Sequence, residues 1–281
     1  DWEKRAVFNP AAIDLDDKIH ILYRAMSEDN TSVVGYASSK NGTTIVERLP
    51  YPIYTPTENF EKKNIPGGNS GCEDARITEI KDRLYMTYTA YNGTDVPAVA
   101  LTSIHKKDFL AQEWNWETPV LISPEGIDDK DACIIDHVKQ GKHFFIHRLN
   151  NTLCGSYINL KKPDRAVDHV VMMSPRQGMW DNMKVGLSCP PFKTKKGWLM
   201  LYHGVSHDGI YRVGAALFDL NDPTVLISRM NDFILEPVES FEKSGQINNV
   251  VFPCGAVIRN DQIFMYYGGA DTVCAMASLN L

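Results

Sequence analysis

One unit of sequence recurs five times along this 281-residue chain, and the repeat restricts the fold more than any other feature. Each copy has a short apolar segment, a polar turn, and a second apolar segment rich in aromatic residues. Copies follow one another at intervals of roughly 55 to 65 residues, and such a fixed period is the signature of repeat architectures. The first segments are 7–13, 74–77, 131–135, 189–192 and 251–257, and the second are 19–24, 84–88, 143–148, 198–203 and 263–267.

A third segment of small residues follows most copies, as at 34–38, 99–103, 213–217 and 274–278. Each unit is therefore predicted to be a three- or four-stranded antiparallel sheet, with hairpin turns at 16–18, 81–83, 140–142 and 260–262. No long window keeps a helical period. We predict an all-β, five-bladed β-propeller that forms one domain over residues 1–281, because ring closure removes exposed sheet edges. A β-sandwich is the alternative.

Charge and composition exclude several classes of function. The net charge of −6 and pI near 5.8 argue against nucleic acid or an anionic membrane as the main partner. No apolar run is long enough to span a bilayer, and no signal peptide is visible, although the chain begins at Asp1 without Met. The six cysteines show no metal-ligand spacing, so free buried thiols in a reducing compartment are expected, with a disulfide as the alternative. No metal or other cofactor is expected.

The segment 71–76 contains adjacent carboxylates, Glu73 and Asp74, where the first strand of the second repeat begins. Adjacent residues of a strand face opposite sides, so only one of the two is expected to point into the central channel. A Glu-Asp pair is more often a solvated turn than a catalytic group. Its place at a channel-lining strand favours the catalytic interpretation.

Four cationic or hydrogen-bonding side chains lie at related positions of the later repeats: Lys130, Arg148, Lys184 and His203. Taken singly, Lys and Arg usually lie on the surface, and a histidine in an apolar strand is usually structural. If the four converge on the channel, they form an anion site, because desolvated like charges repel unless an anion lies between them.

Further polar and aromatic residues suit a hydroxyl-rich ligand. Asn9, Arg24 and Asp271 lie at or next to channel-lining segments, although Gly and Asp around 268–271 also suit a plain turn. Aromatic faces for sugar stacking are available among residues that are otherwise expected in the core: Trp180, Tyr202, Tyr211 and Phe252.

These motifs together resemble glycoside hydrolase family 130, the β-mannoside phosphorylases and related β-mannosidases, nearly from end to end. The matching pieces include Val7–Pro10, Gly71–Arg76, Lys130–Ala132, Lys184–Gly186, Gly197–Val205, Val251–Cys254 and Tyr266–Asp271. The resemblance implies a five-bladed propeller, in agreement with the repeat count. It also implies an inverting mechanism in which inorganic phosphate attacks the anomeric carbon of a β-mannoside.

The resemblance assigns roles residue by residue. Asp74 matches the general acid, which passes its proton to the glycosidic oxygen through the mannosyl 3-hydroxyl. The phosphate-binding positions fall on Lys130, Arg148, Lys184 and His203, with Tyr211 as a further contact, and the mannosyl-binding positions fall on Asn9, Arg24, Asp74 and Asp271, with Phe252 near the same pocket. Two departures are Lys130, where some members have Arg, and Asp136, where a Pro is common.

Three functions remain open from the sequence. The first is a β-mannoside phosphorylase with phosphate as co-substrate, and the second is an inverting β-mannosidase that uses water and a carboxylate base such as Glu239 or Glu242. The third is a sugar-binding propeller without catalysis. The acceptor sugar and the linkage depend on the loops 55–70 and 164–181. A bacterial cytoplasm is the expected location, and a homo-oligomer is possible by resemblance.

Overall fold

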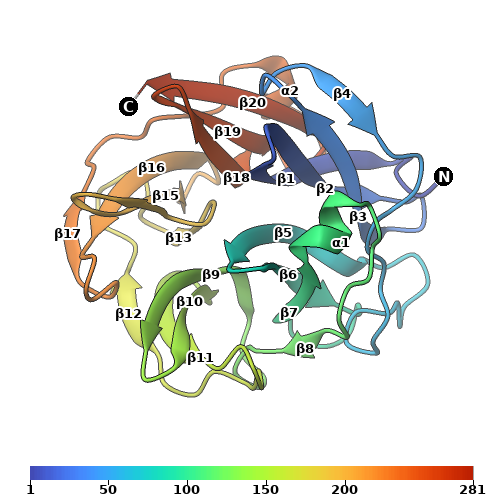
Figure 1. Ribbon diagram of the computed structural model, residues 1–281. Helices are drawn as coiled ribbons and strands as arrows, with labels where there is room; N and C mark the ends of the chain where they lie inside the picture. The colour runs from blue at the N-terminus through green and yellow to red at the C-terminus, as the bar shows by residue number, and fades with distance from the viewer. Residues whose placement is uncertain (281) are drawn as a thin grey trace.

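The computed structural model describes residues 1–280, which form twenty strands and two short helices. The strands are grouped in five antiparallel blades around a ring, so the predicted five-bladed propeller is confirmed (Figure 1). Blade 1 contains β1 (Ala6–Leu15), β2 (Lys18–Met26), β3 (Thr31–Ser39) and β4 (Ile45–Arg48). Blade 2 contains β5 (Ser70–Ile80), β6 (Arg83–Tyr91), β7 (Ala98–His105) and β8 (Val120–Leu121), with α1 (Lys106–Leu110) after β7. A short parallel contact between β3 and β5 joins these two blades in one sheet.

The remaining blades continue around the ring in chain order. Blade 3 contains β9 (Asp129–Lys139), β10 (Lys142–Leu149), β11 (Thr152–Ile158) and β12 (Val170–Met173). Blade 4 contains β13 (Lys184–Leu187), β14 (Phe192–Thr194), β15 (Gly197–Val205), β16 (Tyr211–Phe218) and β17 (Leu226–Arg229). Blade 5 follows α2 (Ser240–Lys243) and contains β18 (Val251–Arg259), β19 (Gln262–Gly269) and β20 (Val273–Asn280).

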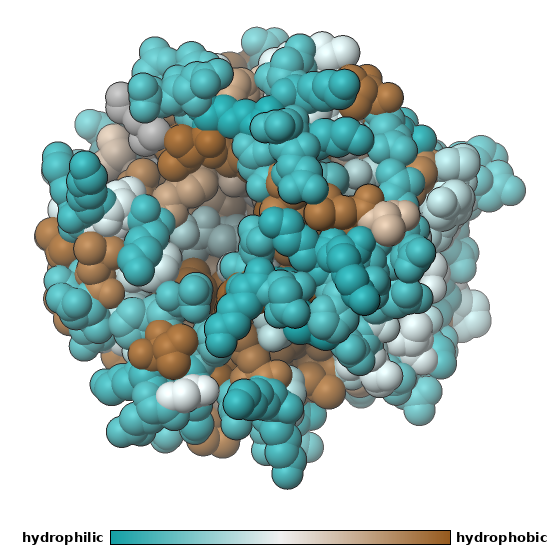
Figure 2. All heavy atoms as spheres, viewed as in Figure 1, coloured by the Kyte–Doolittle hydropathy of each residue, from teal (hydrophilic) through white to brown (hydrophobic). Residues whose placement is uncertain are grey.

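The first strands of the blades pack against one another, β1 against β5 and β18, and β9 against β5 and β13. The face of the ring in view is hollowed near its centre (Figure 2). The third small-residue segments lie in β3, β7, β16 and β20, as predicted. No helix among the described residues is long and apolar enough to cross a membrane.

Local sequence explains the details of the hairpins and strands. Asp16 and Asp17, and likewise Asn260 and Asp261, both adopt positive φ, as a type I′ hairpin turn requires. The first strand expected at 189–192 is instead divided into β13 and β14, both paired with β15. Pro190 and Pro191 lie in this gap, and proline has no N–H to donate to a strand ladder.

A hydrogen bond between an aromatic side chain and a carboxylate recurs in all five blades. The aromatic residue lies at the same position of each second strand or its blade 4 counterpart, and the carboxylate precedes or begins the first strand of the same blade. The pairs are Tyr23–Glu3 (2.9 Å), Tyr88–Glu61 (2.6 Å), His147–Asp129 (2.9 Å), Tyr202–Asp181 (2.9 Å) and Tyr267–Glu242 (2.6 Å). We call these contacts the blade ties, because each fixes the chain entering a blade to that blade's central strand.

The six cysteines are free thiols, as expected. Cys72, Cys133, Cys154, Cys189 and Cys254 are buried, whereas Cys274 is exposed and departs from the prediction. Burial raises the pKa of the Cys133 and Cys189 thiols, which keeps both protonated at neutral pH. The buried cysteines therefore act as small apolar residues of the core.

Candidate active site

Three polar side chains on the first strands occupy β-bulges. Asn9, Asp74 and Asp131 have φ of 49°, 53° and 50°, and the pairing register of β1, β5 and β9 shifts at these points. A bulge redirects side chains, and Asn and Asp tolerate a left-handed backbone better than most residues. The side chains of Asn9, Asp74 and Asp131 therefore do not follow the regular alternation of side chains between the two faces of a strand.

Arg24 of β2 gathers the first group of predicted site residues. Its Nη2 lies 2.8 Å from Glu73 Oε1, and its Nη1 lies 3.2 Å from Asp74 Oδ1. Asn9 Nδ2 donates to the same Asp74 oxygen at 2.8 Å. The expectation that Glu73 and Asp74 face opposite sides is therefore wrong, because the bulge at Asp74 brings both carboxylates to one guanidinium.

Asp271 lies near this group, because the charges of Asp74, Arg24 and Glu73 act on its carboxyl group. It follows β19 with a left-handed backbone, and burial together with the Asp74 carboxylate raises its pKa from an ordinary 3.8 to about 6. The charge of Arg24 and the nearby Asn9 side chain oppose this shift. The structure thus brings together Asn9, Arg24, Asp74 and Asp271, which the sequence analysis predicted to bind the mannosyl unit.

Asp131 gathers the second group. Arg148 Nη1 lies 3.1 Å from Asp131 Oδ2, and His203 Nε2 lies 3.4 Å from the same oxygen. Burial raises the pKa of Asp131, but the charge of Arg148, the neighbouring His203 ring and the charge of Arg76 outweigh burial and hold the pKa well below its ordinary value. Burial lowers the pKa of His203. Lys184 lies close by, and burial and the Arg148 charge lower its pKa.

Aromatic rings border the second group. The His203 ring centroid lies 4.6 Å from that of Phe252 and 6.1 Å from that of Tyr211. Lys184 Nζ lies 5.8 Å from the Tyr211 centroid. Lys130 pairs with Arg148 through the β9–β10 ladder, and its charge acts on Lys184. The predicted anion-binding residues of blades 3 and 4 are therefore neighbours in the structure.

Two other aromatic candidates for sugar stacking lie elsewhere. Trp180 stacks on Tyr202 with a centroid distance of 5.5 Å, and its Nε1 donates to the Asn231 carbonyl. The Tyr202 side chain is buried in the core and takes part in a blade tie. These two rings support the fold of blade 4, which agrees with the structural interpretation weighed for them.

Glu239 and Glu242, the two carboxylates considered as a base for hydrolysis, form hydrogen bonds at the start of helix α2. Glu242 accepts from the backbone N–H groups of Val238 and Glu239 and from Tyr267 Oη, and only 1% of it is exposed. Glu239 is the N-cap of α2 and forms a capping box with Glu242. Neither residue is placed as a catalytic base.

Sequence reasoning missed Arg76, although it lies in the segment that was singled out. Arg76 is 1% exposed, and its Nη1 donates to the Asp74 carbonyl at 2.8 Å while its Nη2 lies 3.3 Å from Asp131 Oδ1. It connects the Arg24 group with the Asp131 group. Strand alternation gives no signal for this connection, because the bulge at Asp74 changes the direction of the residues that follow.

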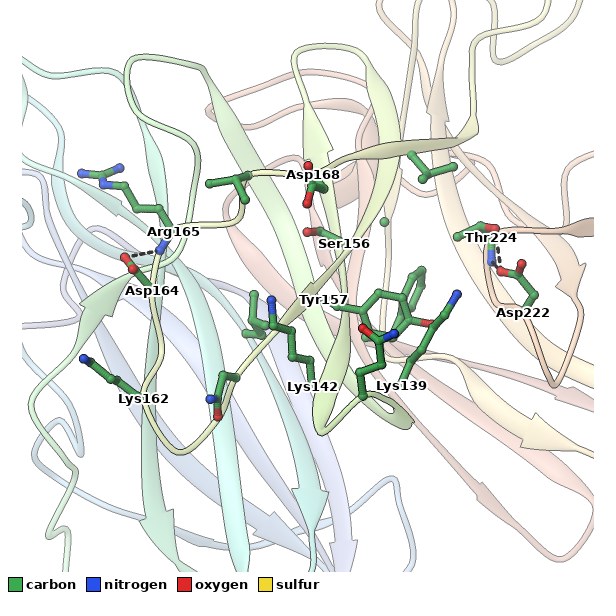
Figure 3. Close-up of a pocket in the computed structure, with 17 residues that line it drawn as sticks. Lys139, Lys142, Ser156, Tyr157, Lys162, Asp164, Arg165, Asp168, Asp222 and Thr224 are labelled. Atoms are coloured by element: carbon green, nitrogen blue, oxygen red, sulfur yellow. Dashed lines mark hydrogen bonds between the residues drawn. The ribbon is translucent and has the colours of Figure 1, made fainter.

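A separate cavity of about 460 Å³ opens on the outer part of blade 3. Lys139, Lys142, Tyr157 and Lys162 lie around it, far along their strands and loops from the bulges (Figure 3). None of the predicted site residues lines it. Among residues 1–280, no group of three or more His, Cys, Asp or Glu side chains is placed to hold a metal ion.

Residues 2–281 match the model of glycoside hydrolase family 130, described as β-1,4-mannooligosaccharide phosphorylase. The chain belongs to glycoside hydrolase family 130. It is similar to a β-1,2-mannobiose phosphorylase of a Thermoanaerobacter species, with 36% identity over 99% of this chain and 91% of the relative.

Solved structures of family 130 share the fold. The β-1,2-mannobiose phosphorylase of Listeria innocua in complex with β-1,2-mannobiose superposes with a TM-score of 0.81 and 27% identity, over 98% of this chain and 90% of that chain. A second solved structure is described with the statement that the family 130 mannoside phosphorylases contain glycoside hydrolases that target β-1,2-mannosidic linkages in Candida mannan. Its TM-score is 0.84 with 29% identity, over 99% of this chain and 85% of that chain. The family thus contains both reaction types.

Proposed function

We propose that this protein is an inverting β-mannoside phosphorylase, which converts a β-mannoside and phosphate into α-mannose 1-phosphate and a shortened acceptor sugar. The observation that carries the proposal is the gathering of Arg148, Lys184 and His203 around Asp131, next to the group that contains Asp74. The charges of Arg148 and Lys184 exceed that of the one carboxylate and repel each other unless a multivalent anion lies between them, and the His203 ring adds a hydrogen-bonding group.

The geometry supports a division of labour in the reaction. Asn9 and Arg24 both donate to Oδ1 of Asp74, which fixes the carboxyl group and leaves Oδ2 outside these two contacts. Asp74 delivers a proton towards the glycosidic oxygen as the bond from C1 to that oxygen breaks. A phosphate oxygen forms the new bond to C1 from the opposite face, and the proton on phosphate replaces the one that Asp74 gave up.

Phosphate also removes the need for a catalytic base. An inverting hydrolase needs a second carboxylate to activate water, whereas phosphate is already a nucleophile. Glu239 and Glu242, the carboxylates that the hydrolytic alternative would use, are engaged in the capping box of α2. This arrangement favours phosphorolysis over hydrolysis.

The substrate proposed for the first assay is a β-1,2-linked mannoside. It rests on the two β-1,2-mannobiose phosphorylases to which the chain is similar. A location in the bacterial cytoplasm is part of the proposal, because a charged sugar phosphate is retained only inside a membrane.

Product analysis tests the proposal. The protein is incubated with β-1,2- and β-1,4-mannobiose, with and without phosphate, and α-mannose 1-phosphate is measured beside free mannose. Formation of α-mannose 1-phosphate only with phosphate is expected, and Asp74→Asn should lower turnover by about 10² to 10⁴, the usual loss for a general acid. Two equivalents of free mannose at the same rate without phosphate would show a hydrolase instead.

A further inference from the structure

Arg76 connects three blades from a buried position on β5. Its Nε donates to the Ser188 carbonyl at 3.2 Å, and its Nη2 donates to the Leu187 carbonyl at 3.0 Å. Its Nη1 donates to the Asp74 carbonyl at 2.8 Å, and its Nη2 lies 3.3 Å from Asp131 Oδ1. All three nitrogens of the guanidinium are therefore used, and the side chain has no freedom to shift without losing a contact.

Asp131 continues this connection on its other oxygen. Its Oδ2 lies between Arg148 Nη1 and His203 Nε2, at 3.1 and 3.4 Å. A Cβ on Gly186 would lie 2.5 Å from His203 ring atoms and 2.7 Å from Asp131 Oδ2. The carboxylate and the imidazole therefore fill the space that glycine leaves, and their relative position is fixed by close packing.

Arg76 and Asp131 are buried, and each nitrogen of the Arg76 guanidinium and each oxygen of the Asp131 carboxylate lies against another group of the protein. Their charged atoms therefore act through those groups. We propose that Arg76 and Asp131 are positioning residues that hold the proton donor Asp74 in register with the phosphate-binding side chains Arg148 and His203. This inference rests on the proposed phosphorolysis and names residues that the reaction needs beyond those that touch the substrates.

The proposed reaction depends on the position of Asp74 relative to the attacking phosphate. Inversion requires the proton donor and the attacking phosphate to lie on opposite faces of one sugar, and a misplacement of about 1 Å can cost about 10²-fold in rate. Asp74 also has a left-handed backbone, and such a conformation persists only where surrounding contacts hold it. The hydrogen bond from Arg76 to the Asp74 carbonyl is one of those contacts.

The test compares four variants of the 281-residue chain: Arg76→Lys, Asp131→Asn, the double variant that combines them, and the control Asp181→Asn. Asp181 is a matched control because it is also buried and bridges two arginines, Arg176 at 2.8 Å and Arg229 at 2.5 Å. Steady-state kinetics are measured for phosphate with two donors, a β-mannobiose and β-mannosyl fluoride. Fluoride leaves with little proton assistance, so the second donor reports phosphate attack with a smaller demand on Asp74.

Asp131→Asn is expected to raise the KM for phosphate about tenfold or more with both donors, because Arg148 and His203 lose the charge that holds them. Arg76→Lys is expected to lower kcat about 10²-fold with mannobiose and much less with mannosyl fluoride, since Lys cannot reproduce the contact to Asp74 together with the other three. Asp181→Asn is expected to lower the unfolding temperature while leaving the phosphate KM unchanged. The Arg76/Asp131 double variant should lose less than the product of the single losses, because the two residues act as one unit.

An unchanged phosphate KM in Asp131→Asn, or an equal loss with both donors in Arg76→Lys, would overturn the inference. If Asp131→Asn does not fold, Arg76→Lys decides through the comparison of donors. Wild-type kinetics separate this inference from the proposed function: wild-type turnover that ignores phosphate refutes phosphorolysis itself, whereas phosphate-dependent wild-type turnover with unaffected variants refutes only the positioning roles.

Discussion

Replacing Asp271 with asparagine should remove a loss of stability that the wild type undergoes as the pH rises from about 4 to 7.5. Asp271 is mostly buried beside the carboxylates of Asp74 and Glu73, and its pKa is raised from 3.8 to about 6. The folded state therefore binds this proton more tightly than the unfolded state does. The resulting stabilisation is fully present below pH 3.8 and is lost as the pH rises through about 6.

The size of the effect follows from the shift. A rise of about two pKa units at 1.36 kcal/mol per unit corresponds to about 3 kcal/mol of lost stability at neutral pH. Asparagine has nearly the same shape and does not titrate. The free energy of unfolding of Asp271→Asn, minus that of the wild type, should therefore increase by about 2 to 3 kcal/mol between pH 4 and pH 7.5.

Denaturant unfolding of both proteins, followed by fluorescence and circular dichroism, measures this difference at each pH. Asp271→Ala serves as a matched second variant, because it also lacks the titrating group but packs differently. Its stability offset should differ from that of Asp271→Asn, whereas its pH dependence should be the same. A stability difference that stays flat from pH 4 to pH 7.5, or that falls with rising pH, would refute the reasoning.

Two further variants test the packing and the choice between reactions. Gly186→Ala places a Cβ 2.5 Å from His203 ring atoms, so it should raise the phosphate KM by displacing His203. Gly214→Ala, whose Cβ has Trp180 and Tyr202 as its nearest neighbours, should leave that KM unchanged. Equal phosphate KM values in the two variants would contradict this. Glu242→Gln should lower the free energy of unfolding by about 1 to 3 kcal/mol, because the hydrogen bonds of Glu242 are structural. The phosphate-dependent kcat of this variant should stay nearly unchanged. Loss of turnover without loss of stability would instead indicate that Glu242 is a catalytic base.

The repeat made the fold predictable from the sequence, because five similar units with no helical period have few ways to bury their sheets. The same repeat placed Arg148 and His203 at equivalent positions of β10 and β15, so their meeting at one site was also predictable. The contact between them was not. It passes through Asp131, whose direction depends on a bulge that strand periodicity does not reveal.

The functions of the carboxylates were the hardest to predict. Glu242 was considered as the carboxylate base of a hydrolase, yet its partners are two backbone N–H groups and Tyr267. Residues such as Glu61 and Asp181 precede their strands at differing distances along the chain, so the blade ties leave no fixed spacing to detect. Only the aromatic member recurs at a regular position.

The blade ties also suggest how chemistry can change in this fold while its architecture is kept. In every central strand the residue directly after the tied aromatic side chain is Arg24, Thr89, Arg148, His203 or Gly268. Four of these lie against site residues, and Thr89 pairs across the ladder with Glu73. Structural and chemical roles thus alternate along one short stretch of each blade. A combinatorial library confined to these five positions would sample new specificities and leave every blade tie in place. The propeller is therefore a convenient scaffold for enzyme engineering.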